Sequence, residues 1–303
     1  MMDGYINVLK PPGMSSGAVV AIVKRATGEK VGHAGTLDPE AAGILPVMVG
    51  RATRLFDFLV EKQKTYLAEI AFGFATNTQD AQGTVTETGE NIPDLNRLQS
   101  ILPRFTGTIM QRPPVYSALK QGGKPLYMLA RKGQTADIPE RPIEIMRLDA
   151  VRSMPNNGFL LRVVCGRGTY IRTLCHDIGI ALGCPAHMRF LLREQTGAFD
   201  LSTAVTIEQI KRAAADGSLG KYLIPCDAPL AHLARYDVPE RYQKLCLNGV
   251  RLRQDEWPCS VPCGAYIRLY AQDRFIGISQ AAADETLVPC VVFNNNQEGC
   301  TQA

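Results

Sequence analysis

The 303-residue chain has no long apolar run. Its best candidate, Ala41 to Val49, is interrupted by Gly43 and Pro46 and falls short of the roughly 20 apolar residues that a helix needs to cross a bilayer. The first residues carry no basic flank followed by an apolar stretch, so no export signal is visible. We therefore expect a soluble, cytoplasmic protein without membrane association.

Patterns for binding metals and nucleotides are missing as well. The loose spacing of Cys259, Cys263, Cys290 and Cys300, with no histidine nearby, is only weak evidence for zinc. The nine cysteines, an odd number, are typical of free thiols in a reducing compartment. The sequence contains neither a G-K-[S/T] phosphate loop nor a dinucleotide-binding glycine fingerprint after a strand. We therefore expect no cofactor.

The composition is that of a globular protein. Hydrophobic residues make up 46% and charged residues 20% of the chain, which excludes disorder and fibrous repeats. Prolines and a change to short strand patterns mark a boundary near residue 230. We expect a main domain over residues 1–230, with an excursion at about 112–141, and a small β-barrel over residues 235–303.

Charge is unevenly distributed along the chain. A net charge of +4 is too small to prove a nucleic-acid partner. Residues 111–133, however, hold five basic side chains and no acidic one, and residues 162–193 hold five arginines against one acid, Asp177. The two stretches together could form an electropositive face for a phosphate backbone, whereas either alone could equally be a solvated surface.

Local patterns predict several helices and strands. Ser15 or Ser16 can cap a helix that runs to Gly28, and apolar residues at helical spacing predict a second helix over residues 171–182 that ends at Gly183. Strands are predicted over residues 5–9, 66–72, 159–164, 266–270 and 274–278. The glycine-punctuated segment 32–39 is expected to be a loop.

Asp38 is the first candidate for chemistry. It precedes Pro39, which fixes the backbone, and glycines on both sides of it leave room for a ligand. An aspartate before proline is also a common turn residue, so the position alone does not establish catalysis. Ser15, in Gly13-Met14-Ser15-Ser16-Gly17, formally matches a serine-hydrolase elbow, although a helix cap explains it better.

A second candidate group is Gly168-Thr169-Tyr170-Ile171-Arg172. An arginine beside an aspartate would lower the pKa of the carboxyl and keep it ionised, as a nucleophile requires. Tyr170 and Tyr66 each offer a flat face for a base and a hydroxyl for proton transfer, but each is also compatible with a core aromatic. His33, five residues before Asp38, could be either a hydrogen-bonded scaffold residue or a catalytic residue.

These segments together resemble the bacterial tRNA pseudouridine synthase B family, over nearly the whole chain. The similar segments are Lys10-Pro11-Pro12-Gly13-Met14-Ser15-Ser16, Gly32-His33-Ala34-Gly35-Thr36-Leu37-Asp38-Pro39, Lys64-Thr65-Tyr66, Thr78-Gln79-Asp80-Ala81-Gln82-Gly83, Gln111-Arg112-Pro113-Pro114 and Arg167-Gly168-Thr169-Tyr170-Ile171-Arg172. One departure is Leu191-Leu192-Arg193-Glu194, where the family often has L-R-R-T. This segment has one basic residue fewer and one acidic residue more than the family pattern. A local contact with an RNA phosphate is therefore in doubt, but the catalytic residues are unaffected.

The resemblance implies an α+β fold with a large, mostly antiparallel sheet flanked by helices and a small C-terminal barrel of the PUA type. It implies a monomeric enzyme, with no obligate protein partner, that isomerises uridine-55 in the T-loop of tRNA to pseudouridine. Asp38, Tyr66 and Arg172 would be catalytic. The residues that would bind the substrate or the RNA are His33, Gly35, Tyr170, Lys10, Lys64, Lys120, Lys124, Arg131 and Leu191.

Three alternatives remain at this point. The basic surface also suits a non-catalytic helper of tRNA folding, which would not need an ionised Asp38. A serine hydrolase would use Ser15. A guide-dependent relative fits less well, because the basic excursion at 112–141 suits direct binding of tRNA.

Overall fold

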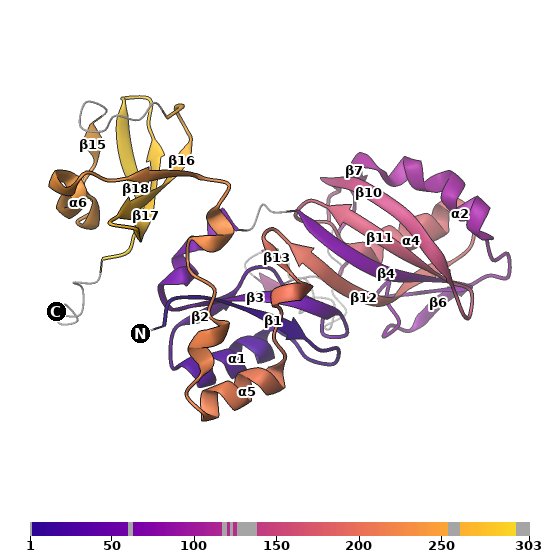
Figure 1. Ribbon diagram of the computed structural model, residues 1–303. Helices are drawn as coiled ribbons and strands as arrows, with labels where there is room; N and C mark the ends of the chain where they lie inside the picture. The colour runs from indigo at the N-terminus through magenta and orange to yellow at the C-terminus, as the bar shows by residue number, and fades with distance from the viewer. Residues whose placement is uncertain are drawn as a thin grey trace.

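The computed structural model describes residues 2–59, 63–116, 120–121, 124–125, 138–253 and 261–294. These residues form a nine-stranded sheet, a five-stranded sheet near the C-terminus and two short hairpins (Figure 1). The predicted combination of a large mixed sheet with a small C-terminal sheet is confirmed. Of the helices in these ranges, none combines the length and the hydropathy that a bilayer crossing demands.

The large sheet spans the main body of the molecule. Its strands are, in spatial order, β1 (Gly4–Lys10), β3 (Ala42–Val49), β12 (Ala186–Thr196), β4 (Lys64–Phe72), β11 (Gly158–Cys165), β10 (Arg141–Met154) and β7 (Gly107–Gln111), while β2 (Val31–His33) pairs with β3 and β13 (Phe199–Asp200) pairs with β12. Neighbours are antiparallel except β3 and β12, which run parallel and pair Gly43 with Arg193. This parallel pair joins two halves of the sheet.

Each half of the large sheet has its own helices. Helices α1 (Ser16–Thr27) and α5 (Ile207–Ala215) bury apolar side chains against β1 and β3, whereas α2 (Leu95–Ile101) and α4 (Ile171–Leu182) pack on the half that contains β4, β10 and β11 (Figure 1). Burial of these apolar faces removes them from water and holds each helix on its half.

The predicted boundaries of two helices are confirmed. The Ser15 hydroxyl accepts a hydrogen bond from the amide of Ala18 at 3.1 Å and caps α1, and Gly28 ends the helix with a φ of 70°. Gly183 ends α4 in the same way, with a φ of 65°. Local sequence is sufficient here because each cap is set by one residue.

The two halves approach each other closely at Gly43. Its φ of +116° is rare for residues with a side chain, and a Cβ placed on it would overlap the backbone of Arg193. Glycine at this position therefore permits the parallel pairing of β3 with β12, and this pairing brings segments from both halves into one site.

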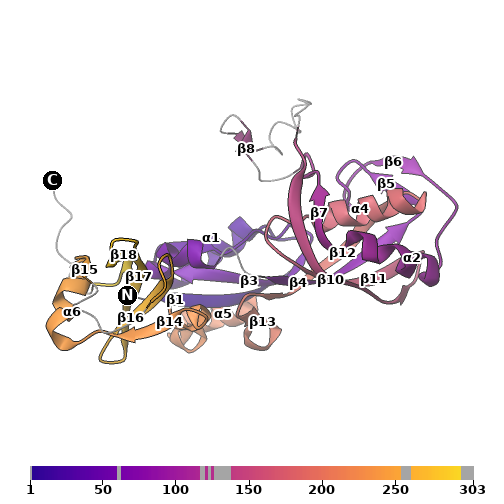
Figure 2. The ribbon, with the colours of Figure 1, turned by 90° about the horizontal axis from the view of Figure 1, so that it is seen from above.

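Shorter elements complete the main body. They are η1 (Gly50–Phe58), β5 (Phe74–Thr76), β6 (Val85–Thr88), η2 (Leu102–Phe105), β8 (Lys120–Gln121), β9 (Lys124–Pro125), η3 (Leu201–Thr203), η4 (Leu219–Tyr222) and η5 (Ala228–Leu230). Strands β8 and β9 pair with each other, and Figure 2 shows β8 standing clear of the large sheet. They lie within the predicted excursion at 112–141, of which residues 112–116 and 138–141 are also described.

The small sheet follows η5. Its spatial order is β14 (Ala234–Asp237), β16 (Tyr266–Ala271), β17 (Arg274–Ala281), β18 (Thr286–Val292) and β15 (Leu252–Arg253), with α6 (Glu240–Leu247) beside it. Ile278, Val291 and Phe293 extend a hydrophobic cluster that includes Tyr5 and Leu55 of the main body. The small sheet is thus packed on the main body by buried apolar contacts.

Candidate active site

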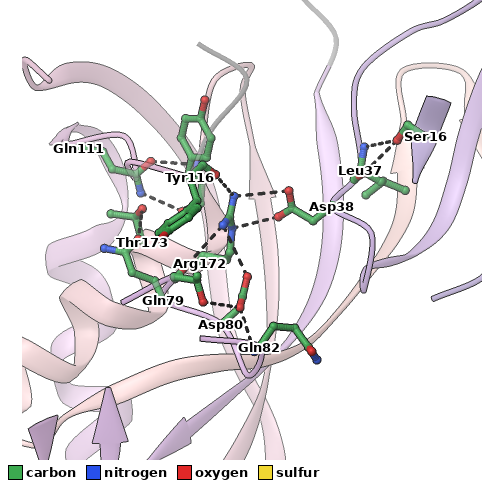
Figure 3. A network of polar contacts seen from close by, with 12 residues as sticks. Ser16, Leu37, Asp38, Gln79, Asp80, Gln82, Gln111, Tyr116, Arg172 and Thr173 are labelled. Carbon is green, nitrogen blue, oxygen red and sulfur yellow. Dashed lines mark hydrogen bonds and ion pairs between the residues drawn. The ribbon is translucent and has the colours of Figure 1, made fainter. Parts of the chain in front are cut away.

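Ser16 fixes one end of the loop that follows β2 by two hydrogen bonds to Leu37. The Ser16 hydroxyl donates a hydrogen bond to the carbonyl of Leu37 at 2.9 Å and accepts one from the amide of Leu37, also at 2.9 Å (Figure 3). Ser16 is the first residue of α1 and is buried. The residue before Asp38 is therefore held at both of its backbone polar groups.

Lys10 holds the other side of the same loop. Its ammonium donates to the carbonyls of Pro11 at 2.8 Å, Met14 at 2.7 Å and Pro39 at 2.8 Å. The side chain is 0% exposed, and burial lowers the pKa of Lys10 to about 8, so that the charged form still predominates at neutral pH. The expectation that Lys10 binds substrate is not met, because all three donors of the ammonium are used within the protein.

Asp38, on the loop after β2, faces Arg172 at the start of α4 (Figure 3). Nε of Arg172 lies 3.0 Å from Oδ2 of Asp38, and Nη2 lies 3.4 Å from Oδ1. Arg172 sits in the first turn of α4 with only 7% of its side chain exposed, whereas 37% of the Asp38 side chain remains exposed. The carboxylate is thus oriented by a buried guanidinium and still open on one side.

Arg172 is itself held by several acceptors. Nη1 lies 3.5 Å from Oδ2 of Asp80, and Nη2 donates to the carbonyl of Tyr116 at 3.1 Å. Asp80 is fixed in its turn by the Thr78 hydroxyl at 2.6 Å and the Gln82 amide at 3.0 Å (Figure 3). The sequence pointed to Asp80 only as part of the segment 78–83 that resembles the family, and gave it no role. The structure shows instead that both carboxylates share one guanidinium.

The pKa of Asp38 is raised above its ordinary value, mainly by burial. The positive charges of Arg172 and Lys10 lower this pKa, and the negative charge of Asp80 raises it. Arg172 therefore lowers the pKa of Asp38, as the sequence predicted, but the loss of hydration outweighs the ion pair and the net shift is upward. Without Arg172 the pKa would be higher still.

Tyr66 lies on β4 and is only 7% exposed. Burial raises the pKa of the Tyr66 phenol, while the charge of Arg193 and a hydrogen bond to that side chain lower it. Tyr66 and Arg193 are direct neighbours across the β4–β12 pairing. The phenol is therefore in the electrostatic reach of Asp38, which also acts on its pKa.

Four of the five arginines of residues 162–193 are buried or paired with an acidic side chain. Arg172 and Arg193 are buried, Arg162 pairs with Glu194 at 3.3 Å, and Arg189 pairs with Glu69 at 2.7 Å. Glu194, the acid that departs from the family pattern, is thus the partner of Arg162. The sequence shows that these side chains are basic. It does not show that the fold buries two of them and places two more in ion pairs.

Four further predicted residues lie around this centre. Leu191 is 6% exposed and belongs to the same hydrophobic cluster as Tyr66. His33 lies half-buried at the end of β2, where burial and the charge of Arg193 lower its pKa. Gly35 accepts a hydrogen bond from Arg193 at 3.1 Å through its carbonyl. Burial and the same charge lower the pKa of Lys64, on β4.

Tyr170 immediately precedes α4. Its amide donates to the Gln111 side chain at 2.9 Å, and the Gln111 amide group donates to the Tyr170 carbonyl at 3.1 Å. Gln111 is 2% exposed and ends β7. The sequence did not single out this pair of contacts, which fixes the turn that presents Arg172.

The other positions that the sequence singled out are three basic residues, Ser15 and the C-terminal cysteines. Lys120 and Lys124 belong to the β8–β9 hairpin, while Arg131 lies outside the described residues. Ser15 serves as the cap of α1 and not as part of a hydrolase elbow. Within the described ranges no three His, Cys, Asp or Glu side chains gather as metal ligands, and Cys259 and Cys300 fall outside those ranges.

Comparison with known proteins agrees with the geometry. The model of the TruB family pseudouridylate synthase N-terminal domain matches residues 23–171, and that of the tRNA pseudouridylate synthase B C-terminal domain matches residues 172–231. The tRNA pseudouridine synthase B of Alkaliphilus oremlandii is 40% identical over 279 residues, with 91% of this chain and 92% of the relative covered. That of Pelotomaculum thermopropionicum is 39% identical over 292 residues, covering 93% and 92%.

Solved structures show the same fold. A chain of a Cbf5–Nop10–Gar1 complex superposes with a TM-score of 0.73 at 26% identity, covering 96% of this chain and 84% of that one. A chain of the archaeal box H/ACA sRNP Nop10–Cbf5 complex gives a TM-score of 0.71 at 25% identity, covering 96% and 85%. The chain belongs to the TruB family of pseudouridylate synthases.

Proposed function

We propose that this protein converts uridine-55 in the T-stem-loop of tRNA to pseudouridine. The observation that carries the proposal is the Asp38–Arg172 ion pair, presented by a loop that Ser16 and Lys10 hold in place. The relatives named tRNA pseudouridine synthase B supply the substrate class. The reaction breaks the C1′–N1 bond of the uridine, turns the uracil and forms a C1′–C5 bond, so it needs no external oxidant or energy source.

Asp38 would act on the sugar of the target uridine, as a nucleophile at C1′ or as a base. Both roles need the ionised carboxylate, which Arg172 and Lys10 favour against burial. The 37% exposure of the Asp38 side chain leaves one side open to a substrate. The uridine would reach it by flipping out of its loop, at a cost of a few kcal/mol of stacking.

Tyr66 would stack on the flipped uracil and move the proton from C5. Tyr170 would pack beside the base, and His33, which its lowered pKa keeps neutral, would fill the space that the nucleotide leaves. The half-buried Lys64 and the core residue Leu191 would line this pocket around Tyr66.

The excursion at 112–141, which includes the β8–β9 hairpin, would close over the RNA through Lys120, Lys124 and Arg131. The small C-terminal sheet would act as a PUA-type RNA-binding domain. We propose further that the protein works as a monomer in the cytoplasm without an obligate protein partner. The seven cysteines that the structure describes are free thiols, as expected in a reducing compartment.

The test is incubation of the full chain with an unmodified tRNA transcript, followed by carbodiimide mapping of pseudouridine. We expect one modified position, in the T-loop. Asp38→Asn should abolish product in a tritium-release assay while tRNA binding stays within a few-fold. Product formation by Asp38→Asn at the wild-type rate would refute the role assigned to Asp38, whereas absence of pseudouridine with the wild-type protein would leave a helper of tRNA folding.

A further inference from the structure

Arg193 is a fully buried arginine next to the site, at 0% exposure. Its Nε donates to the carbonyl of Ile44 at 2.9 Å, and Nη2 donates to the carbonyl of Gly35 at 3.1 Å. Ile44 lies on β3 and Gly35 lies three residues before Asp38. The side chain therefore passes from the central strand β12 to the base of the loop that carries Asp38.

The same guanidinium acts on Tyr66. Tyr66 and Arg193 lie directly opposite each other across β4 and β12, and Arg193 lowers the pKa of the Tyr66 phenol. The side-chain hydrogen bonds of Arg193 in the described part of the chain go to two carbonyls rather than to a carboxylate. A buried charge with neutral partners keeps its full electrostatic effect on its neighbours, because no counter-ion cancels it.

The geometry points to Arg193 as a positioning residue for the isomerisation: it holds the Tyr66 hydroxyl and the Gly35 carbonyl in one fixed arrangement. Asp38 lies on the loop after β2, whereas Tyr66, the residue proposed to move the C5 proton, lies on β4. The Arg193 side chain lies between the loop and the phenol. This inference rests on the proposed function, since it assigns Arg193 to the same reaction.

Electrostatics supports the assignment. The groups that act on the Tyr66 phenol are Arg193 from β12, Cys165 from β11 and Asp38 from the loop after β2. Burial, Cys165 and Asp38 all raise the pKa of the phenol, and Arg193 is the group that lowers it. Loss of Arg193 would therefore loosen the Tyr66 side chain and raise the pKa of its phenol. A smaller fraction of the phenol would then be ionised and able to accept the C5 proton.

The experiment compares Arg193→Lys and Arg193→Met with Arg189→Met in single-turnover and steady-state assays on an unmodified tRNA transcript. Arg189 is the matched control, because it lies on the same strand, binds the carbonyls of Pro155 and Asn156, and pairs with Glu69 away from the site. We expect kcat to fall about 100-fold in Arg193→Met and about 10-fold in Arg193→Lys, with KM within about threefold of wild type. Arg189→Met should keep kcat within about threefold.

A second measurement separates positioning from folding. In a Tyr66→Phe background, Arg193→Lys should lower the remaining single-turnover rate by no more than about threefold, because the partner through which it acts is gone. An equal loss in both backgrounds, a loss confined to KM, or a wild-type kcat in Arg193→Lys would overturn the inference. If Arg193→Met does not fold, the lysine variant and the double variant decide. Absence of pseudouridine with the wild-type protein would refute the proposed function instead.

Discussion

Replacement of Arg172 by glutamine tests the central ion pair most directly. Arg172 is 7% exposed and contacts Asp38 at 3.0 Å and Asp80 at 3.5 Å. Removal of one partner from a buried pair costs about 3–5 kcal/mol. Because 37% of the Asp38 side chain is exposed and solvent screens that charge, we expect about 2 kcal/mol instead. In a domain of this size that corresponds to a fall in Tm of about 4–8 °C.

The catalytic effect of Arg172→Gln should be larger than the loss of stability explains. Asp38 loses both its orientation and the charge that favours its ionised form, so we expect kcat to fall about 100-fold. In the proposed mechanism, activity requires the ionised carboxylate and decreases as pH falls through its pKa. Since burial raises that pKa and Arg172 lowers it, the acid limb of the rate profile should move to higher pH in Arg172→Gln.

The assay is single-turnover pseudouridine formation between pH 5 and 9, with thermal melting of the same samples. Arg189→Gln is the control, because it breaks an ion pair with Glu69 at 2.7 Å but leaves the site intact. It should lower Tm without moving the acid limb. An acid limb that stays in place in Arg172→Gln, or moves to lower pH, would refute the assignment of Arg172 as the group that favours ionised Asp38.

Three further predictions concern the scaffold of the site. Lys10→Met leaves three carbonyls without their donor and should lower the free energy of unfolding by about 2–4 kcal/mol in urea titrations. The pKa of Lys10 is lowered to about 8 in the folded state, so with rising pH the folded state releases this proton before the unfolded state does. The stability of the wild type relative to Lys10→Met should therefore rise between pH 8 and 10.5. Ser16→Ala frees both polar groups of Leu37 and should reduce kcat about 10-fold at a cost of about 1–2 kcal/mol, seen as a kinetic loss larger than the shift in Tm. Gly43→Ala should lower the free energy of unfolding by more than about 3 kcal/mol, because its Cβ would overlap the backbone of Arg193. Gly28→Ala is the control: its φ is also positive but the space around it is open, so it should cost about 1 kcal/mol. Equal losses of stability would show that backbone overlap at position 43 is unimportant.

Local sequence was enough for the elements whose ends depend on single residues. Ser15 and Gly28 bound α1, and Gly183 ends α4, as predicted. The loop with Asp38 was predicted in part: residues 34–39 form a loop as expected, whereas Gly32 and His33 belong to β2 and pair with β3. The strand β3 was not predicted, since Gly43 and Pro46 interrupt its apolar pattern and its pairing partners are remote in the sequence.

The positions of the basic side chains were the least predictable. Lys10 and Arg193 were expected at the RNA surface, yet both are 0% exposed and donate to backbone carbonyls. No local pattern distinguishes such residues from phosphate ligands, because their burial depends on which strands become central in the sheet. The same applies to Asp80, whose part in the site depends on a contact with Arg172, 92 residues further along the chain.

The burial of these cations has a consequence for an enzyme that acts on RNA. Phosphates near the site add negative potential, which by itself would raise the pKa of a catalytic carboxyl and favour its neutral form. Exposed lysines would be engaged by those same phosphates and by salt. Arg172 and Lys10 instead act on Asp38 from inside the protein, where neither phosphate nor salt neutralises them. The carboxylate can therefore stay ionised beside its polyanionic substrate, while one side of it remains open.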